Sequence, residues 1–194
     1  MGFPLAQTPV YSYINALMEL QTTGYRKDTG RYIYEAALAV LKHPYTRQLS
    51  ATAEDLEKQL TKDNRFYPLP SELKKDAFLE QVFTPQNGTA AICRYLTELL
   101  REVAVIYRQE KDEEDIFNQL YRESLFKGYT LINRLLSLIE NDGMSLHTDT
   151  LNRLLTATNI PFHGEPAIGM QVMGVLETRN LDFRNLIMLS LNEG

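Results

Sequence analysis

Apolar residues recur at alternating four- and three-residue steps in the middle of the chain, at Ile92, Leu96, Leu99, Val103 and Ile106. Residues at this spacing lie on one face of an α-helix. The pattern therefore predicts a long amphipathic helix over residues 89–108. Because an apolar stripe of this length is unfavourable in water, we expect other helices to cover it.

Shorter helices are predicted before that stripe. Residues 32–41 carry apolar side chains at close helical spacing, and Pro44 disfavours helix in the residue before it. Residues 52–62 begin with a threonine suited to an N-cap, and Glu54 and Asp55 place negative charge at the positive end of the helix dipole. The sequence Asn87-Gly-Thr89 is typical of a turn before a helix.

A second long helix is predicted after the charged run at residues 110–115. This run suggests a metal site or a basic partner, but the simpler interpretation is a solvated turn whose four acids at 112–115 open the next helix. That helix is expected to extend to about residue 141, interrupted or bent near Gly128. A final helix over residues 147–157, capped by Thr148 or Asp149, completes a region that is helical almost throughout.

The last part of the chain has a different pattern. Residues 171–175 are rich in β-formers, and residues 186–191 form a nearly unbroken apolar run, as in a strand covered on both faces of a parallel sheet. The polar residues 177–182 lie between them, and loops at the carboxyl ends of such strands often bind ligands. From the residues alone, an ordinary hydrophobic αβ unit remains the simpler interpretation.

Three segments resemble a known family. Gly174-Val-Leu-Glu-Thr-Arg-Asn-Leu-Asp-Phe183, followed by the apolar run and Asn192-Glu-Gly194, resembles the fifth conserved motif of superfamily 1 helicases in AddB-like and RecB-like helicase–nuclease subunits. Residues 1–14 are similar to the segment that opens the second motor domain of those proteins, and Leu41-Lys-His-Pro-Tyr45 resembles a turn in its large insertion. The resemblance implies a piece of the second motor domain with its helical insertion.

The departures from that family point to an inactivated helicase. Active members usually place a His and then a Lys-Gly pair in the fifth motif, whereas this chain has Leu176 and Arg179-Asn180 at those positions. The sequence has no Gly-x-x-x-x-Gly-Lys-Ser/Thr phosphate loop, so we expect no ATP hydrolysis by this chain. Glu177 and Asp182 flank an arginine and no lysine follows them, so we expect no nuclease site.

The resemblance implies a fold that is mainly α (α+β). A remnant of the α/β motor domain would comprise residues 1–30 and 166–194 and would form a small, incomplete parallel or mixed sheet. Residues 31–165 would form a helical bundle inserted into it, with the two ends of the chain meeting in space. An incomplete sheet has exposed edges that can pair with another chain, so a dimer through such an edge is expected.

The implied function is a non-catalytic role in DNA end processing and recombinational repair. Thr178 and Arg179 are the candidate phosphate contacts, threonine as a neutral donor and arginine as a forked cation. Tyr11 and Tyr13 could stack on bases, although tyrosines on an early helix are more often part of a core. The alternative is a helical protein-interaction module that holds the rest of its parent chain and a nuclease or helicase partner subunit. An exposed apolar patch on the helical region would favour the alternative.

Composition narrows these interpretations. The formal net charge of −5 argues against affinity for DNA over the whole surface, while a local basic groove remains compatible with it. The lone Cys93 is predicted to be a buried, inert thiol, and the three histidines lie far apart, so no metal and no cofactor is expected. Without a signal-like start or a long apolar span, a cytoplasmic protein without membrane contact is expected.

Overall fold

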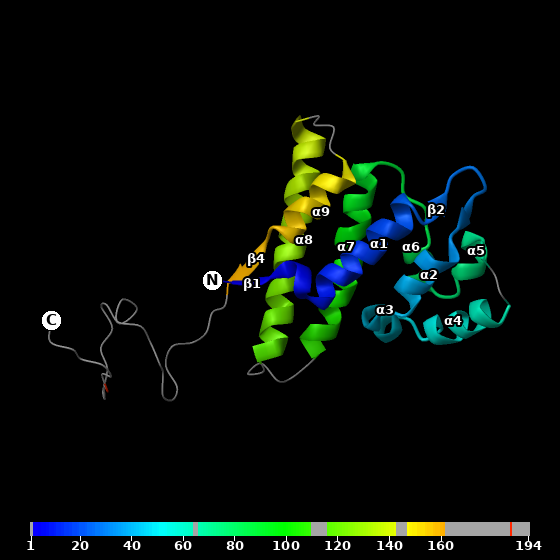
Figure 1. Ribbon diagram of the computed structural model, residues 1–194, viewed down its shortest axis with the longest axis horizontal. Coiled ribbons are helices and arrows are strands. Elements are labelled where there is room, and N and C mark those ends of the chain that lie inside the picture. The colour runs from blue at the N-terminus through cyan, green and yellow to red at the C-terminus, as the bar shows by residue number, and fades with distance from the viewer. Residues whose placement is uncertain (1, 64–65, 110–115, 143–146, 162–186, 188–194) are drawn as a thin grey trace, which may run out of the picture. The chain divides into compact units, whose positions relative to one another are not determined.

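The computed structural model describes residues 2–63, 66–109, 116–142, 147–161 and 187 (Figure 1). The chain divides into two compact units, Met1–Phe162 and His163–Gly194. Nearly all described residues belong to the first unit, which is mainly helical with two short strand pairs. This confirms the predicted fold class of a mainly α protein with a small sheet.

The described elements follow the chain in a simple order. The strands are β1 (Gly2–Pro4), β2 (Tyr25–Arg26), β3 (Arg31–Tyr32) and β4 (Asn159–Pro161). A short 3-10 helix, η1 (Leu5–Gln7), precedes the α-helices, which are α1 (Pro9–Thr22), α2 (Tyr34–Leu41), α3 (Pro44–Leu49), α4 (Ala53–Lys62), α5 (Pro70–Leu73), α6 (Ala77–Val82), α7 (Thr89–Gln109), α8 (Ile116–Asp142) and α9 (Thr148–Thr156).

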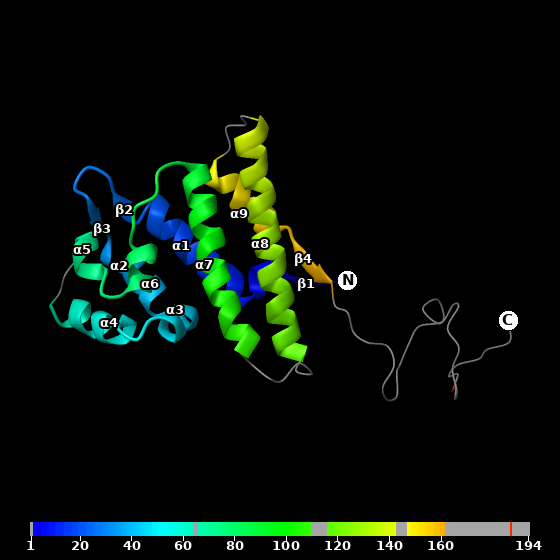
Figure 2. The same ribbon diagram turned by 180° about the vertical axis from the view of Figure 1, so that it is seen from behind.

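Helix α7 carries the apolar stripe as the sequence predicts. Ile92, Leu96, Leu99 and Val103 are at most 4% exposed, and Ile106 is partly buried against the same core. The neighbouring Cys93 is fully buried, which confirms the predicted burial, and burial raises the pKa of its thiol to about 11, which favours an inert thiol. Helix α8 packs along α7, and α1 crosses one face of this pair (Figures 1 and 2).

Gly128 is the point where α8 meets α1. A Cβ at this position would lie 3.2 Å from Cδ1 of Ile14 and 3.7 Å from Cγ1 of Val10, so the missing side chain gives α1 room to approach. Helix α8 runs through this glycine as one element. The predicted interruption near Gly128 is therefore wrong, whereas the alternative of a bend there stays a prediction. The glycine allows close packing of α1 on α8.

Two of the predicted helix starts differ from the structure in how they are capped. Thr52 is the N-cap of α4, but its side chain makes no capping hydrogen bond and instead donates to Asp76 over 2.7 Å. Asp76 also accepts from the hydroxyl of Ser50 and from the backbone N–H of Leu79, so one carboxylate joins the start of α4 to the start of α6.

The N-cap of α9 is His147, so the predicted caps Thr148 and Asp149 are wrong by one or two residues.

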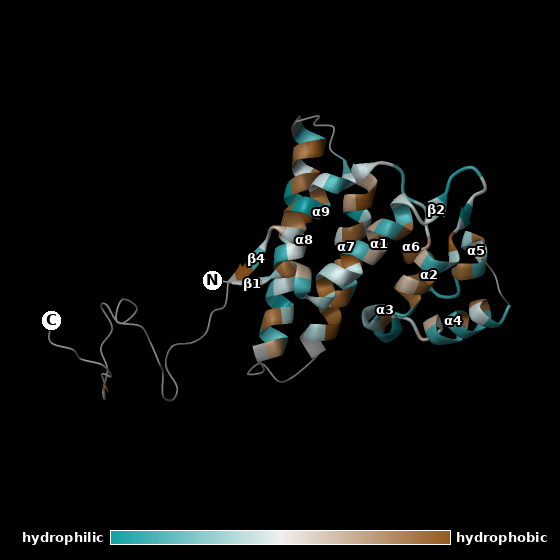
Figure 3. Ribbon diagram, in the orientation of Figure 1, coloured by the Kyte–Doolittle hydropathy of each residue, from teal (hydrophilic) through white to brown (hydrophobic). Residues whose placement is uncertain are grey.

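The start of the chain pairs with the end of the helical region. Strands β1 and β4 are antiparallel, with Phe3 opposite Ile160. Strands β2 and β3 form a second antiparallel pair, a hairpin with a hydrophilic loop (Figure 3). The parallel part of the predicted sheet depends on residues 166–194, where only Ile187 is described, an exposed residue outside helix and strand. The division into residues 1–30 with 166–194, and 31–165, stays a prediction.

Candidate functional site

The predicted phosphate contacts, Thr178 and Arg179, lie outside the described residues, as does the charged run 110–115. Nothing in the structure therefore tests them. Among the described side chains, four places bring functional groups together. They are the two early tyrosines, a serine–histidine pair, a cluster of ion pairs around Glu57, and a groove on α7 and α8.

The two tyrosines proposed to stack on bases both make hydrogen bonds within the protein, and one of them is fully buried. Tyr13 is fully buried, its hydroxyl accepts from Thr46 over 3.3 Å, and burial raises its pKa. Tyr11 is partly buried, and its hydroxyl donates to Asn152 of α9 over 2.9 Å. Base stacking by Tyr13 is therefore excluded, because it belongs to the core between α1 and α3.

Ser12 and His43 form a contact that sequence analysis missed. The hydroxyl of Ser12 lies 3.0 Å from Nε2 of His43, the spacing of a serine nucleophile and its base. However, Nδ1 of His43 accepts the backbone N–H of Tyr45 over 3.3 Å, which places the ring proton on Nε2. Burial lowers the pKa of His43 to about 4, so the ring is neutral at pH 7.

The hydrogen-bond directions decide the role of this pair. Nε2–H of His43 donates to Ser12, and the hydroxyl of Ser12 donates to the carbonyl oxygen of Pro9 over 2.9 Å. The nitrogen that faces the serine is therefore occupied by a proton and cannot accept another. His43 is the N-cap of α3, and the pair links that helix start to the start of α1.

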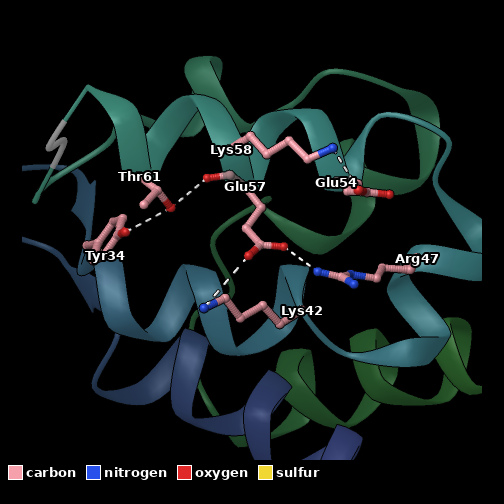
Figure 4. A network of polar contacts seen from close by, with 7 residues as sticks. All are labelled: Tyr34, Lys42, Arg47, Glu54, Glu57, Lys58 and Thr61. Atoms are coloured by element: carbon pink, nitrogen blue, oxygen red, sulfur yellow. Dashed lines mark hydrogen bonds and ion pairs between the residues drawn. The ribbon is translucent and has the colours of Figure 1, made fainter.

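A cluster of ion pairs on α2, α3 and α4 surrounds Glu57 (Figure 4). The carboxylate of Glu57 lies 2.5 Å from Nη2 of Arg47 and 3.7 Å from Nζ of Lys42. Lys58 pairs with Glu54 one turn away over 2.7 Å. Each of these three cations thus faces a carboxylate of the same cluster. We interpret the cluster as a surface network that fixes three helices, not as an anion-binding site.

The fourth place is an open groove between α7 and α8, with a volume of about 840 Å³. We call it the α7–α8 groove. Helix α7 contributes Leu100, Arg101, Glu102, Ala104, Val105 and Tyr107, and helix α8 contributes Arg122, Leu125, Phe126 and Tyr129. The groove extends over two turns of each helix and is mainly apolar in its lining residues. Its volume lies within the range of about 300–1,000 Å³ that is usual for ligand sites.

The α7–α8 groove lies on the side of the helix pair that faces away from α1. Phe126 precedes the α1-contacting Gly128 by two residues, which turns it by about 200° around the axis of α8. Phe126 is 61% exposed and Val105 on α7 is 42% exposed. Among the described elements none crosses this face, which is turned to the viewer in Figure 2.

Both arginines of the groove are positioned by tyrosines. The guanidinium of Arg101 lies 5.6 Å from the ring centroid of Tyr129 and donates to its hydroxyl over 2.7 and 3.2 Å. Arg122 donates to the backbone carbonyl oxygen of Tyr107 over 2.7 Å. The guanidinium of Arg101, held in this way, keeps further N–H groups for other acceptors. The apolar groove therefore carries fixed positive charge.

Other kinds of site find no support within the described ranges. Searched over those residues, the structure holds no group of three or more His, Cys, Asp or Glu side chains suited to a metal ion. In the same part of the chain, every helix is too short or too polar to span a bilayer.

Comparisons with known proteins leave the resemblance untested. No family model, no curated protein and no solved structure matches this chain. The relation to AddB-like and RecB-like subunits therefore stays a prediction.

Proposed function

We propose that this chain is a non-catalytic docking module that holds an amphipathic helix of a partner subunit in the α7–α8 groove. The observation that carries the proposal is the exposure of Phe126 and Val105 beside a preformed apolar groove. Two turns of α7 and α8 match the length over which a bound helix presents apolar residues at positions i, i+3, i+4 and i+7. The sequence resemblance supports a cytoplasmic setting, in a helicase-like subunit for DNA end processing.

The docking function is tested with a neutral helical peptide of 14 residues that carries leucine at those spacings and glutamine elsewhere. We expect fluorescence anisotropy to show saturable binding, with NMR shifts at residues of α7 and α8. Phe126→Ser and Val105→Ser should each weaken binding about tenfold, because each removes an exposed apolar contact at the centre of the groove.

Leu154→Ser is the matched control. Leu154 is 41% exposed on α9 and does not line the groove, so this variant should bind the peptide as the parent protein does. Shifts that map away from α7 and α8, or equal loss in all three variants, would contradict the docking function.

The helicase resemblance supports a second proposal, DNA contact through Thr178 and Arg179. If these residues bind phosphates, a labelled single-stranded oligonucleotide should bind with steep salt dependence in an anisotropy titration. Arg179→Ala should weaken binding and lower the salt slope by about one unit, because one phosphate contact is lost. Arg153→Ala, an exposed cation on α9, is the control. Binding that is absent or insensitive to salt would remove the DNA role.

A further inference from the structure

We infer that the helix held in the α7–α8 groove is acidic along one flank. This inference rests on the proposed docking function and adds the charge of the partner to it. It depends on how Arg101 is placed at the groove.

Arg101 is the central group in this inference. It is exposed on α7, it lines the groove, and it donates two hydrogen bonds to the neutral hydroxyl of Tyr129. The ion pairs of the described residues do not include Arg101, whereas Arg94 two turns earlier on the same helix pairs with Glu140 of α8. A positioned guanidinium that pairs with none of the described carboxylates is suited to an external carboxylate.

The position of Arg101 favours acidic over basic partners. Arg101 contributes a positive charge to the lining of the groove, and Glu102 contributes a negative charge. Glu102 lies at the edge nearer α6, where it also lines a smaller depression with Ala77 and Phe78. A helix whose apolar face enters the groove would thus place one flank beside Arg101. Carboxylates on that flank would pair with it, and ammonium groups would be repelled.

The test uses two variants of the neutral peptide, with the same leucines but with glutamate or lysine in place of the glutamines along one flank. We expect the acidic peptide to bind at least about tenfold more tightly than the basic one at 50 mM salt, with the difference shrinking at 500 mM salt. Arg101→Gln should weaken the acidic peptide about fivefold and leave the neutral peptide unchanged, because only the ion pair is lost. Arg153→Gln on α9 is the matched control and should change neither.

The outcomes separate this inference from the docking function. Equal affinity for the acidic and basic peptides, with the neutral peptide still bound, would overturn the acidic flank alone. Tighter binding of the basic peptide would also overturn it. Failure of all three peptides to bind would overturn the docking function and the inference together. Because Arg101 is exposed, circular dichroism of Arg101→Gln should match the parent protein, which excludes misfolding as the cause of a lower affinity.

Discussion

Replacing Gly24 with alanine is expected to lower the free energy of unfolding by about 3 kcal/mol. A Cβ on Gly24 would lie 2.6 Å from Cβ of Ala36 in α2 and 2.9 Å from both Cα and the carbonyl oxygen of Leu20 in α1. Two of these three atoms belong to the backbone and cannot turn aside. The backbone N–H of Gly24 also donates to Glu19 over 2.7 Å, which fixes the glycine against the end of α1. Thermal unfolding followed by circular dichroism measures the loss, expected to be about 10 °C in Tm.

Gly88→Ala is the matched control for this prediction. Gly88 precedes α7 with φ of 84°, and a Cβ there would meet no atom within 4 Å. Its replacement should cost only about 1 kcal/mol, from backbone strain. If Gly24→Ala cost no more than Gly88→Ala, the close packing between α1 and α2 would be incorrect.

Replacing Gln21 with leucine is expected to lower the free energy of unfolding by a similar amount, about 3 kcal/mol. Gln21 is 3% exposed on α1, and its Nε2 donates to the carbonyl oxygens of Val82 and Thr84 over 3.1 and 3.3 Å. Its Oε1 accepts the backbone N–H of Gln86 over 3.0 Å. Leucine has a comparable volume but would remove all three hydrogen bonds, each of which contributes about 1 kcal/mol. The N–H of Gln86 would lose this acceptor next to the start of α7, whereas Val82 and Thr84 would keep their other donors. Urea unfolding followed by circular dichroism measures the change.

Tyr32→Phe serves as the comparison in the same part of the core. Burial raises the pKa of the Tyr32 hydroxyl, and Gln21 lies close enough to offset part of this rise. The hydroxyl nevertheless has no partner with hydrogen-bond geometry, so its removal should leave stability unchanged or raise it by up to about 1 kcal/mol. Tyr95 is also buried, but its hydroxyl donates to Val82 over 2.9 Å. If Gln21→Leu and Tyr32→Phe had equal effects, the hydrogen bonds of Gln21 would not stabilise the fold.

The helices could be predicted from the sequence where the signal is local. The stripe from Ile92 to Val103 predicts both α7 and its buried face, because apolar residues recur with the helical period over adjacent turns. The predicted interruption of α8 at Gly128 is wrong, since a glycine in a helix gives the same local signal whether it interrupts that helix or lets another helix approach. The sequence does not predict His147 as the N-cap, because Thr148 and Asp149, which are preferred capping residues, follow it directly.

The candidate site could not be predicted in the same way. Phe126 and Val105 are as apolar as core residues, so the sequence does not distinguish them from the core. Their exposure follows from the packing of α1 on the other face of the α7–α8 pair. The contact between Ser12 and His43 joins residues 31 positions apart, and its hydrogen-bond directions depend on the backbone N–H of Tyr45. Such long-range relations leave no local pattern in the chain.

The pairing of β1 with β4 has a consequence for the two ends of the helical region. Residues 2–4 and 159–161 run side by side, so backbone hydrogen bonds tie the start of the chain to the end of that region. All the described helices lie between these two strands in the sequence. Loss of either strand is therefore expected to free both ends of the helical region at once.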